Sequence, residues 1–374
     1  MSNTNSQIIS FLRFPLTFLV VAIHSRGEIG QVPDLMHLTS RNLYDMVKVL
    51  GSDVIAQVAV PSFFFISGYL FFANVSKLDW ATYKSKLGKR VHSLLIPFIL
   101  WNLICIPLTL MVRYGESLSG TSAADAAQTY WDGIRWLHIF WNATSHDSMF
   151  ANLFGMNFLM AHPILGSFWY VRDLIVVTLF TPAIFWFFKY TWKVGAVIVL
   201  LLLLLNIWPY MTPRISCLYY VLGAYWSMSG HNLYIEHALI RRCNYLLTLV
   251  LGIYLVCVFS YESYWGWQLI HLFTVSGMAT TFCLAHQILQ KRPSFRFPKL
   301  LGESSFFVYA LHIEFSLPLG FFIVKALFLH TQQPLLLILQ YLLTPVVIYA
   351  ISLAVYVAAK RVAPRTLSLL TGNR

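Results

Sequence analysis

The chain has 374 residues, of which 58% are hydrophobic and only 11% are charged, and its mean hydropathy is +0.67. Soluble domains carry about 25% charged residues, so this composition excludes an ordinary soluble protein and indicates a polytopic membrane protein. The formal net charge of +12 comes from short basic clusters between apolar runs. Because the positive-inside rule explains such clusters, the charge does not indicate a nucleic acid partner.

Ten stretches of the chain are apolar enough to be candidate membrane spans, which need about 20 residues each. They cover residues 8–25, 54–73, 94–112, 168–188, 194–209, 215–229, 244–260, 267–289, 303–328 and 335–358. The sequence therefore predicts an all-α polytopic membrane protein with about ten transmembrane helices. We expect residues 1–374 to form a single integral-membrane domain with no appended soluble domain.

Both termini are expected on the cytoplasmic side of the membrane. If the chain starts inside and alternates, every loop placed inside is basic, as the positive-inside rule requires. The longest loop placed outside, residues 113–167, contains an apolar run at residues 149–161 that is too short to cross a bilayer. We expect that run to form an interfacial or re-entrant helix over a site at the outer face.

The five cysteines predict neither a disulfide nor a metal site, because the chain has no CxxC motif and no Cys/His ligand spacing. Glycine loops that bind phosphate, nucleophile elbows and zinc-protease motifs are also absent from the sequence. The common catalytic templates of soluble enzymes therefore do not apply.

Arg13 and His24 are ionisable residues inside the first apolar stretch. Such a residue in lipid costs roughly 2.5–3.5 kcal/mol or more unless it faces protein or water. Eleven positions separate the two residues, which is about three helical turns, so they share one face roughly 16 Å apart. Taken alone, Arg13 can be explained as a side chain that snorkels to the inner interface, and His24 as an interfacial histidine at a helix end. Together they favour a polar channel.

A basic cluster precedes the span predicted at residues 94–112. It consists of Lys84, Lys86, Lys89, Arg90 and His92. Topology alone explains such a cluster. Because Arg and Lys are the usual partners of phosphate, the cluster can equally be a phosphate-binding patch at the cytoplasmic mouth of the protein.

Polar residues also occur in later spans. His312 and Glu314 lie in the ninth span, where they are either functional or a buried polar pair that ties helices together. Asp53, Trp169, Arg172 and Asp173 begin spans at the outer side, as substrate contacts or as ordinary charged helix ends. Ser67 and Gly68 fit a polar site or close helix packing through small residues.

Taken in order, these motifs resemble the membrane-bound acyltransferase family 3, whose members O-acylate cell-surface glycans and related acceptors. The matching segments are Arg13 to His24, PSFFFISGY at 61–69, KRVHSLLIPF at 89–98, FWYVRDL at 168–174 and SSFFVYALH at 304–312. The resemblance implies transfer of an acyl group, usually acetyl, from cytoplasmic acyl-CoA to a hydroxyl on the outer side. It carries the essential pair of the family onto Arg13 and His24. The lipid bilayer of a bacterial inner membrane is the implied location.

The resemblance and the residue pattern together assign roles. His24 is the expected general base or acyl acceptor, with Glu314 or Asp53 orienting its ring. The acetyl-CoA contacts are expected at Arg13, Lys86, Lys89, Arg90 and His92, although many relatives have a double-arginine motif where this chain has that cluster. Contacts with a glycan or lipid-linked sugar acceptor are expected at Asp53, Trp169, Arg172, Asp173 and His312. No metal is expected.

Three other functions remain open from the sequence. The acyl group is alternatively succinyl, with Lys325 as a candidate partner for the extra carboxylate. Intramembrane His and Glu residues also fit a proton-coupled transporter of a glycan or a lipid-linked sugar, although the chain lacks the paired repeats common in transporters. A non-catalytic sensor or scaffold is the third possibility. It does not explain why the protein bears the free-energy cost of placing Arg13, His24 and Glu314 inside the membrane.

Overall fold

The structure is a computed structural model that describes residues 2–27, 39–75, 77–117, 139–141, 162–207, 215–258, 264–329 and 331–373. Within these residues every regular element is a helix, so the predicted all-α polytopic fold is confirmed. Helices satisfy their own backbone hydrogen bonds, which is the requirement that lipid imposes on a spanning segment. The run at residues 149–161, with the interfacial helix expected there, lies outside the described residues.

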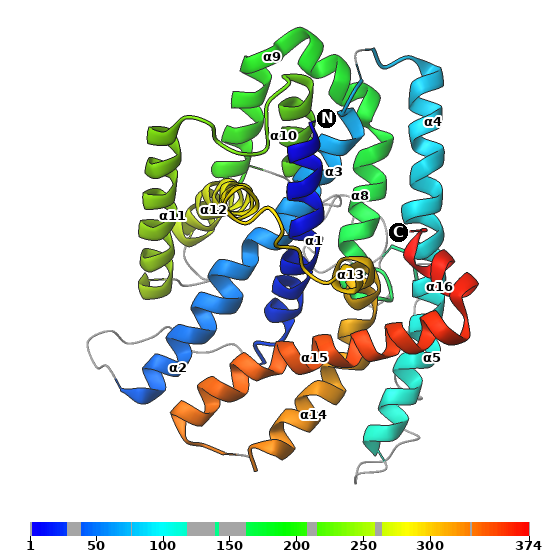
Figure 1. Cartoon of the computed structure of the whole chain (residues 1–374), viewed down its shortest axis with the longest axis vertical. Coiled ribbons are helices and arrows are strands. Elements are labelled where there is room, and N and C mark those ends of the chain that lie inside the picture. The colour runs from blue at the N-terminus through cyan, green and yellow to red at the C-terminus, as the bar shows by residue number, and fades with distance from the viewer. Residues whose placement is uncertain are drawn as a thin grey trace.

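The principal helices are shown in Figure 1. They are α1 (Asn3–His24), α2 (Ser40–Lys48), α3 (Ala59–Phe72), α4 (Trp80–Arg90), α5 (Ile96–Ser117), α8 (Trp169–Leu179), α9 (Thr181–Leu204), α10 (Cys217–Met228), α11 (Ala238–Val258), α12 (Tyr264–Lys291), α13 (Lys299–Leu311), α14 (Leu317–Leu327), α15 (Pro334–Val362) and α16 (Pro364–Thr371). Short π-helical or 3₁₀ turns are η1 (Val49–Val54), η2 (Ile55–Val58), η3 (Val91–Leu95), η6 (Gly166–Phe168) and η7 (His312–Ser316).

Eight helical stretches of the described chain are long and apolar enough to cross a membrane. The difference from the ten predicted spans lies between residues 168 and 229. There the predicted span 168–188 is divided into α8 and the start of α9, and α10 has only 12 residues. Within α9, Trp192 has a positive φ of 48°, and α9 arches over one end of the bundle in Figure 1. A count of ten crossings and the side of each terminus stay predictions.

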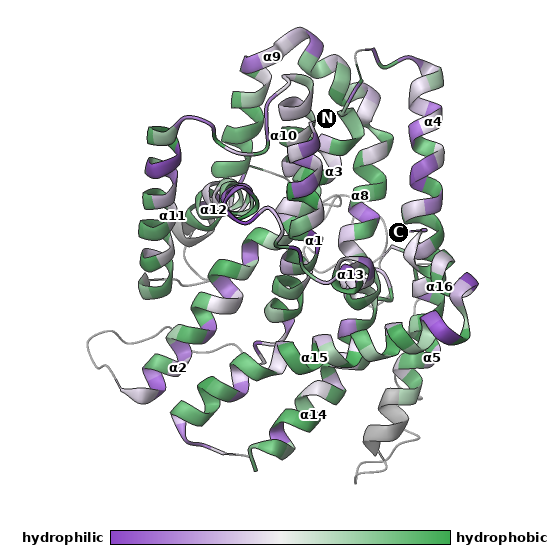
Figure 2. Cartoon of the chain, in the orientation of Figure 1, coloured by the Kyte–Doolittle hydropathy of each residue, from purple (hydrophilic) through white to green (hydrophobic). Residues whose placement is uncertain are grey.

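Helix α1 lies at the centre of the bundle (Figure 1), where it packs against α3, α12, α13 and α15. Its buried residues include Ile8, Leu12, Leu16 and Val20, which recur at helical spacing along one side. Figure 2 shows hydrophobic residues along most of α9, α11 and α15, at the periphery of the molecule. Side chains such as Leu246 on α11 are exposed there and are suited to contact lipid. The sequence thus buries α1 and leaves apolar outer faces.

Helices α3 and α10 pack backbone against backbone through two glycines. A Cβ added to Gly68 would lie 2.1 Å from the Tyr220 carbonyl oxygen, and one added to Gly223 would lie 2.1 Å from that of Phe65. Small residues allow this close approach in membrane helices, which lack a hydrophobic driving force between them. Of the two explanations for Ser67 and Gly68, close packing is confirmed for Gly68.

The C-terminal helix α16 was not among the predicted elements, although Pro364 at its start and Gly372 at its end are ordinary helix boundaries. Gly372 has φ +66°, a left-handed conformation that glycine adopts without strain. The indole nitrogen of Trp101 on α5 donates a hydrogen bond to the Leu370 carbonyl at 2.9 Å. This contact fixes the end of the chain against α5.

Candidate active site

A cavity of about 310 Å³ lies between α1, α3, η3, α8 and α13. Most of its wall is apolar, contributed by side chains such as Leu16, Val20, Phe63, Leu94 and Phe306. Its polar lining residues are Arg13, Thr17, Ser67, Arg90, Ser93, Tyr170, Glu303, Ser305 and Tyr309. We call the part beside the two arginines the arginine end and the part beside the two tyrosines the tyrosine end. The cavity therefore offers an apolar passage with different chemistry at each end.

The arginine end is formed by Arg13 of α1 and Arg90 of α4. Arg13 is exposed, so the cavity is accessible from this end. The guanidinium of Arg90 donates a hydrogen bond to the Ser67 carbonyl oxygen of α3 at 3.3 Å, which places it against the wall. Glu303 of α13 also lines this region, and Lys360 pairs with its carboxylate at 2.9 Å. Two guanidinium groups beside an apolar passage suit a ligand with an anionic head and a neutral tail.

The predicted basic cluster is divided by its helical positions. Lys86 points to α3, where its ammonium donates a hydrogen bond to the Phe71 carbonyl and lies 5.4 Å from that residue's ring centre. Lys89 and His92 are exposed and do not line the cavity, and His92 Nδ1 lies 3.0 Å from the Gly88 carbonyl oxygen. Arg90 is thus the member of the cluster that the structure brings to Arg13.

Tyr170 and Tyr309 form the tyrosine end of the cavity. The Tyr309 hydroxyl donates a hydrogen bond to the Ser167 carbonyl oxygen. Its ring is stacked on Phe168, with ring centres 5.6 Å apart and planes 6° apart. These contacts fix the position of Tyr309 in the wall of the cavity. Sequence analysis did not single out Tyr309, because a tyrosine in an apolar span is ordinary core composition.

Two histidines stand beyond Tyr309. The His312 ring centre is 5.9 Å from that of Tyr309 and 5.1 Å from that of His24. His312 is fully buried and His24 is half-buried. Arg13, Thr17 and Val20 line the cavity, and His24 follows Val20 one turn later on that side of α1. The structure therefore agrees with the predicted shared face of α1, although His24 itself does not line the cavity.

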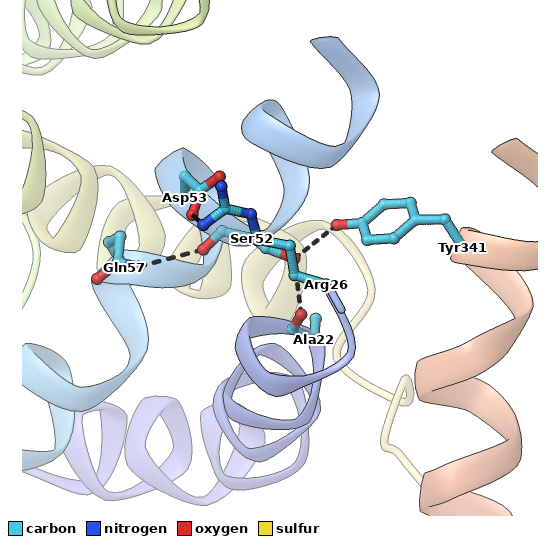
Figure 3. A network of polar contacts seen from close by, with 6 residues as sticks. All are labelled: Ala22, Arg26, Ser52, Asp53, Gln57 and Tyr341. Carbon is cyan, nitrogen blue, oxygen red and sulfur yellow. Dashed lines mark hydrogen bonds and ion pairs between the residues drawn. The ribbon is translucent and has the colours of Figure 1, made fainter. Parts of the chain in front are cut away.

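The end of α1 that carries His24 is held by the polar network in Figure 3. Arg26 and Asp53 form an ion pair at 2.7 Å in which both side chains are largely buried. Ser52 donates a hydrogen bond to the Ala22 carbonyl at 2.7 Å and lies 2.8 Å from the Tyr341 hydroxyl. Residues 22 and 26 flank His24, so this network anchors its backbone to η1 and α15. The structure places Asp53 in this anchor, and its contact with a substrate and its orienting role toward His24 stay predictions.

Glu314 follows His312 in the π-helical turn η7 and faces α5. Its carboxylate accepts a hydrogen bond from the Thr109 hydroxyl at 2.9 Å. The two residues occupy different sides of the turn, as their spacing predicted. An orienting role of Glu314 toward His24 stays a prediction.

The outer-side candidates on α8 form a buried cluster. Arg172 Nε donates to Asp173 Oδ1 at 2.9 Å, and Arg172 Nη1 donates to the Trp141 carbonyl at 2.6 Å. Arg172 and Asp173 are 3% and 0% exposed, so the pair holds residue 141 against α8. Trp169 is half-buried, with its ring centre 6.4 Å from that of Phe64. Contact of these residues with an acceptor stays a prediction.

Among the described residues, no group of three or more His, Cys, Asp or Glu side chains is arranged to hold a metal ion. Arginines at an exposed mouth, an apolar passage and a histidine pair beyond it form the arrangement that a function must explain.

The family model for the acyltransferase domain of acyltransferase family 3 matches residues 7–357 of the chain. No curated protein and no solved structure matches the chain. The matched range includes Arg13, His24, the cavity and His312. Together with the eight candidate membrane spans, this match shows that the chain belongs to acyltransferase family 3 and is a membrane acyltransferase.

Proposed function

We propose that the protein transfers an acetyl group from cytoplasmic acetyl-CoA to a hydroxyl of an extracytoplasmic glycan or lipid-linked sugar. The observation that carries this proposal is the cavity that opens beside Arg13 and Arg90 and ends at Tyr309, next to the two histidines. Both termini on the cytoplasmic side fit the distribution of basic residues. The family membership supports a bacterial inner membrane as the setting.

The donor fits the cavity by its chemistry. The nucleotide and phosphates of acetyl-CoA are anionic, and Arg13 and Arg90 present guanidinium groups that bind phosphate in a bidentate manner. The pantetheine arm is long and neutral, and the passage beyond the arginines is lined by side chains such as Leu16 and Val20. In this orientation the thioester points toward Tyr309 and His24.

The reaction assigns the proton transfers to His24. An unprotonated ring nitrogen of His24 accepts the proton of the acceptor hydroxyl as the oxygen attacks the thioester carbonyl. The tetrahedral oxyanion then collapses, the carbon–sulfur bond breaks, and the leaving thiolate takes the proton from the imidazolium. The products are the acetyl ester and free CoA thiol, and His24 returns to its neutral form. Transfer through an acyl-histidine is the alternative route, in which His24 itself attacks the thioester.

The test is turnover of radiolabelled acetyl-CoA by purified protein in liposomes, with wild type beside His24→Ala and Arg13→Ala. We expect His24→Ala to lower turnover by about 10²–10⁴-fold, because it removes the general base. Arg13→Ala should weaken donor binding by about 10-fold or more, since it removes a charged phosphate contact.

Arg242→Ala is the matched control, because Arg242 is exposed on α11 away from the cavity. Active His24→Ala protein, or acetyl-CoA binding that is unchanged in Arg13→Ala, would contradict the assignment. Succinyl-CoA is measured in parallel. Lys325, the residue considered for a succinyl carboxylate, is exposed in the last turn of α14 and does not line the cavity.

A further inference from the structure

We propose that His312 is the positioning residue of His24. Nε2 of His312 accepts a hydrogen bond from the His24 ring, the role that a carboxylate has beside the catalytic histidine of other enzymes. This inference rests on the proposed function, in which His24 is the base. It deepens that function by naming the group that fixes which nitrogen of His24 faces the substrate.

The tautomer of His312 follows from its backbone contact. His312 Nδ1 lies 2.6 Å from the Tyr309 carbonyl oxygen. A carbonyl only accepts, so Nδ1 is the protonated nitrogen and donates this hydrogen bond. In the neutral ring, Nε2 then carries a lone pair and acts as an acceptor. The side chain of His312 is therefore set to receive a proton donor at Nε2.

The surroundings of Nε2 leave that acceptor available. Nε2 is buried and has no hydrogen-bond partner among the described residues, and His312 is 0% exposed. A buried polar atom without a partner destabilises a protein, so a nearby donor is expected to bond to it when the substrate is bound. The aromatic ring nearest to His312 on α1 is that of His24, 5.1 Å between ring centres.

The separation of the two rings is compatible with a direct contact. When two imidazoles turn edges toward each other, ring centres about 5 Å apart leave facing nitrogens at about 3 Å, a hydrogen-bond distance. The planes are 52° apart, and rotation of the half-buried His24 ring about its side-chain bonds brings its N–H to Nε2. Catalytic hydrogen bonds are often long before substrate binds and tighten afterwards.

The contact determines the chemistry of His24. If one ring nitrogen of His24 donates to His312, the other carries the lone pair and is directed to the acceptor hydroxyl. No proton passes to His312: the proton taken from the hydroxyl stays on His24 until the thiolate leaves. A neutral partner also suits this location, because the neighbouring carboxylates are held by other groups, Asp53 by Arg26 and Glu314 by Thr109.

The first test compares His312→Phe with His312→Gln in the purified protein. Phe keeps an aromatic ring but removes the acceptor, whereas the Gln carbonyl oxygen keeps one. We expect His312→Phe to lower kcat by about 100-fold with KM for acetyl-CoA within about 2-fold of wild type, and His312→Gln to recover most of that loss. His286→Phe is the control, because His286 is a buried histidine stacked on Tyr234 away from the cavity.

The second test does not depend on acyl transfer. Diethylpyrocarbonate modifies neutral imidazole, and mass spectrometry follows its rate at His24. Loss of the acceptor should slow modification of His24 in His312→Phe by about 10-fold, with His312→Gln close to wild type. A ring that is only loosened by the substitution reacts faster, not slower.

Equal or faster modification of His24 in His312→Phe, or an unreactive His24 in wild type, would overturn the inference. If wild type shows no acyl transfer but His312→Phe slows His24 modification, the histidine pair stands and the proposed reaction fails. If acyl transfer is observed but His312→Phe has wild-type kcat, the reaction stands and the pairing fails.

Discussion

His24 and Arg13 share one face of α1, yet they have different surroundings. Arg13 is exposed at the arginine end of the cavity, whereas His24 lies beyond the tyrosine end, next to His312. The helical period alone predicts the shared face, because positions 13, 17, 20 and 24 recur on one side. The period gives no information about the partner of His24, which comes from a distant part of the chain.

The basic cluster provides a residue-scale prediction with an internal control. Arg90 lines the cavity, whereas Lys89, its neighbour in sequence, is exposed on another face of α4. Arg90→Ala should weaken binding of acetyl-CoA by about 10-fold, since a charge-assisted contact is lost. Lys89→Ala should change the binding of acetyl-CoA by less than about 2-fold. Equilibrium binding of the labelled donor checks both values, and equal losses in the two variants would refute the assigned orientation.

The ion pair beside His24 provides a second prediction. Arg26 and Asp53 are 11% and 3% exposed in their side chains, so removing the Asp53 charge breaks a largely buried ion pair. Asp53→Asn should therefore destabilise the protein by about 3 kcal/mol, measured as a fall in melting temperature. The double variant Arg26→Leu with Asp53→Leu should melt above Asp53→Asn, because replacing a buried ion pair with apolar side chains costs less stability than breaking it. An Asp53→Asn protein that melts like wild type would contradict the anchoring role.

At the scale of elements, Gly68 and Gly223 bring the backbones of α3 and α10 into contact. Ser67 and Gly68 are neighbours in sequence with separate functions: Ser67 lines the cavity and Gly68 meets the backbone of α10. The small-residue pattern indicated a close contact, because membrane helices approach each other through such residues. It did not indicate the partner helix, since several later spans also contain glycine.

The surroundings of Gly68 and Gly88 predict opposite effects of substitution on stability. Gly68→Leu should lower the melting temperature and the yield of folded protein, because a Cβ there already meets the Tyr220 carbonyl at 2.1 Å. Gly88→Ala, in the exposed last turn of α4 before the helical backbone continues into η3, meets nothing within 4 Å and should raise the melting temperature by improving helix propensity. Thermal unfolding in detergent measures both. A Gly68→Leu protein as stable as wild type would argue against the α3–α10 packing.

The broken helices were the elements that the sequence predicted least well. Hydropathy marks apolar stretches, but it does not register a change of direction such as that at Trp192 in α9, where φ is 48°. The same applies to the π-helical turn η7, which interrupts the predicted ninth span at His312–Ser316. These features depend on local backbone geometry, and the hydropathy of a stretch contains no information about that geometry.

At the scale of the whole molecule, a central helix surrounded by others creates the site. Helix α1 is in contact with α3, α12, α13 and α15, so residues along its length meet partners from most of the chain (Figure 1). The cavity is bounded by α1, α3, α8 and α13 with the η3 turn, which are widely separated in sequence. Under the proposed function, this passage would let a donor from one side of the membrane and an acceptor from the other meet at His24.

The sequence by itself determined that this is an all-helical polytopic membrane protein, and that Arg13 and His24 share one side of α1. Those properties follow from composition and from a period of 3.6 residues, both of which are local. Only the tertiary structure brought Arg90 to Arg13, set Tyr309 at the end of the cavity and placed His312 beside His24. Such neighbours are decided by helix packing, because apolar faces in a membrane look alike in sequence and the close approach of particular helices is what selects among them.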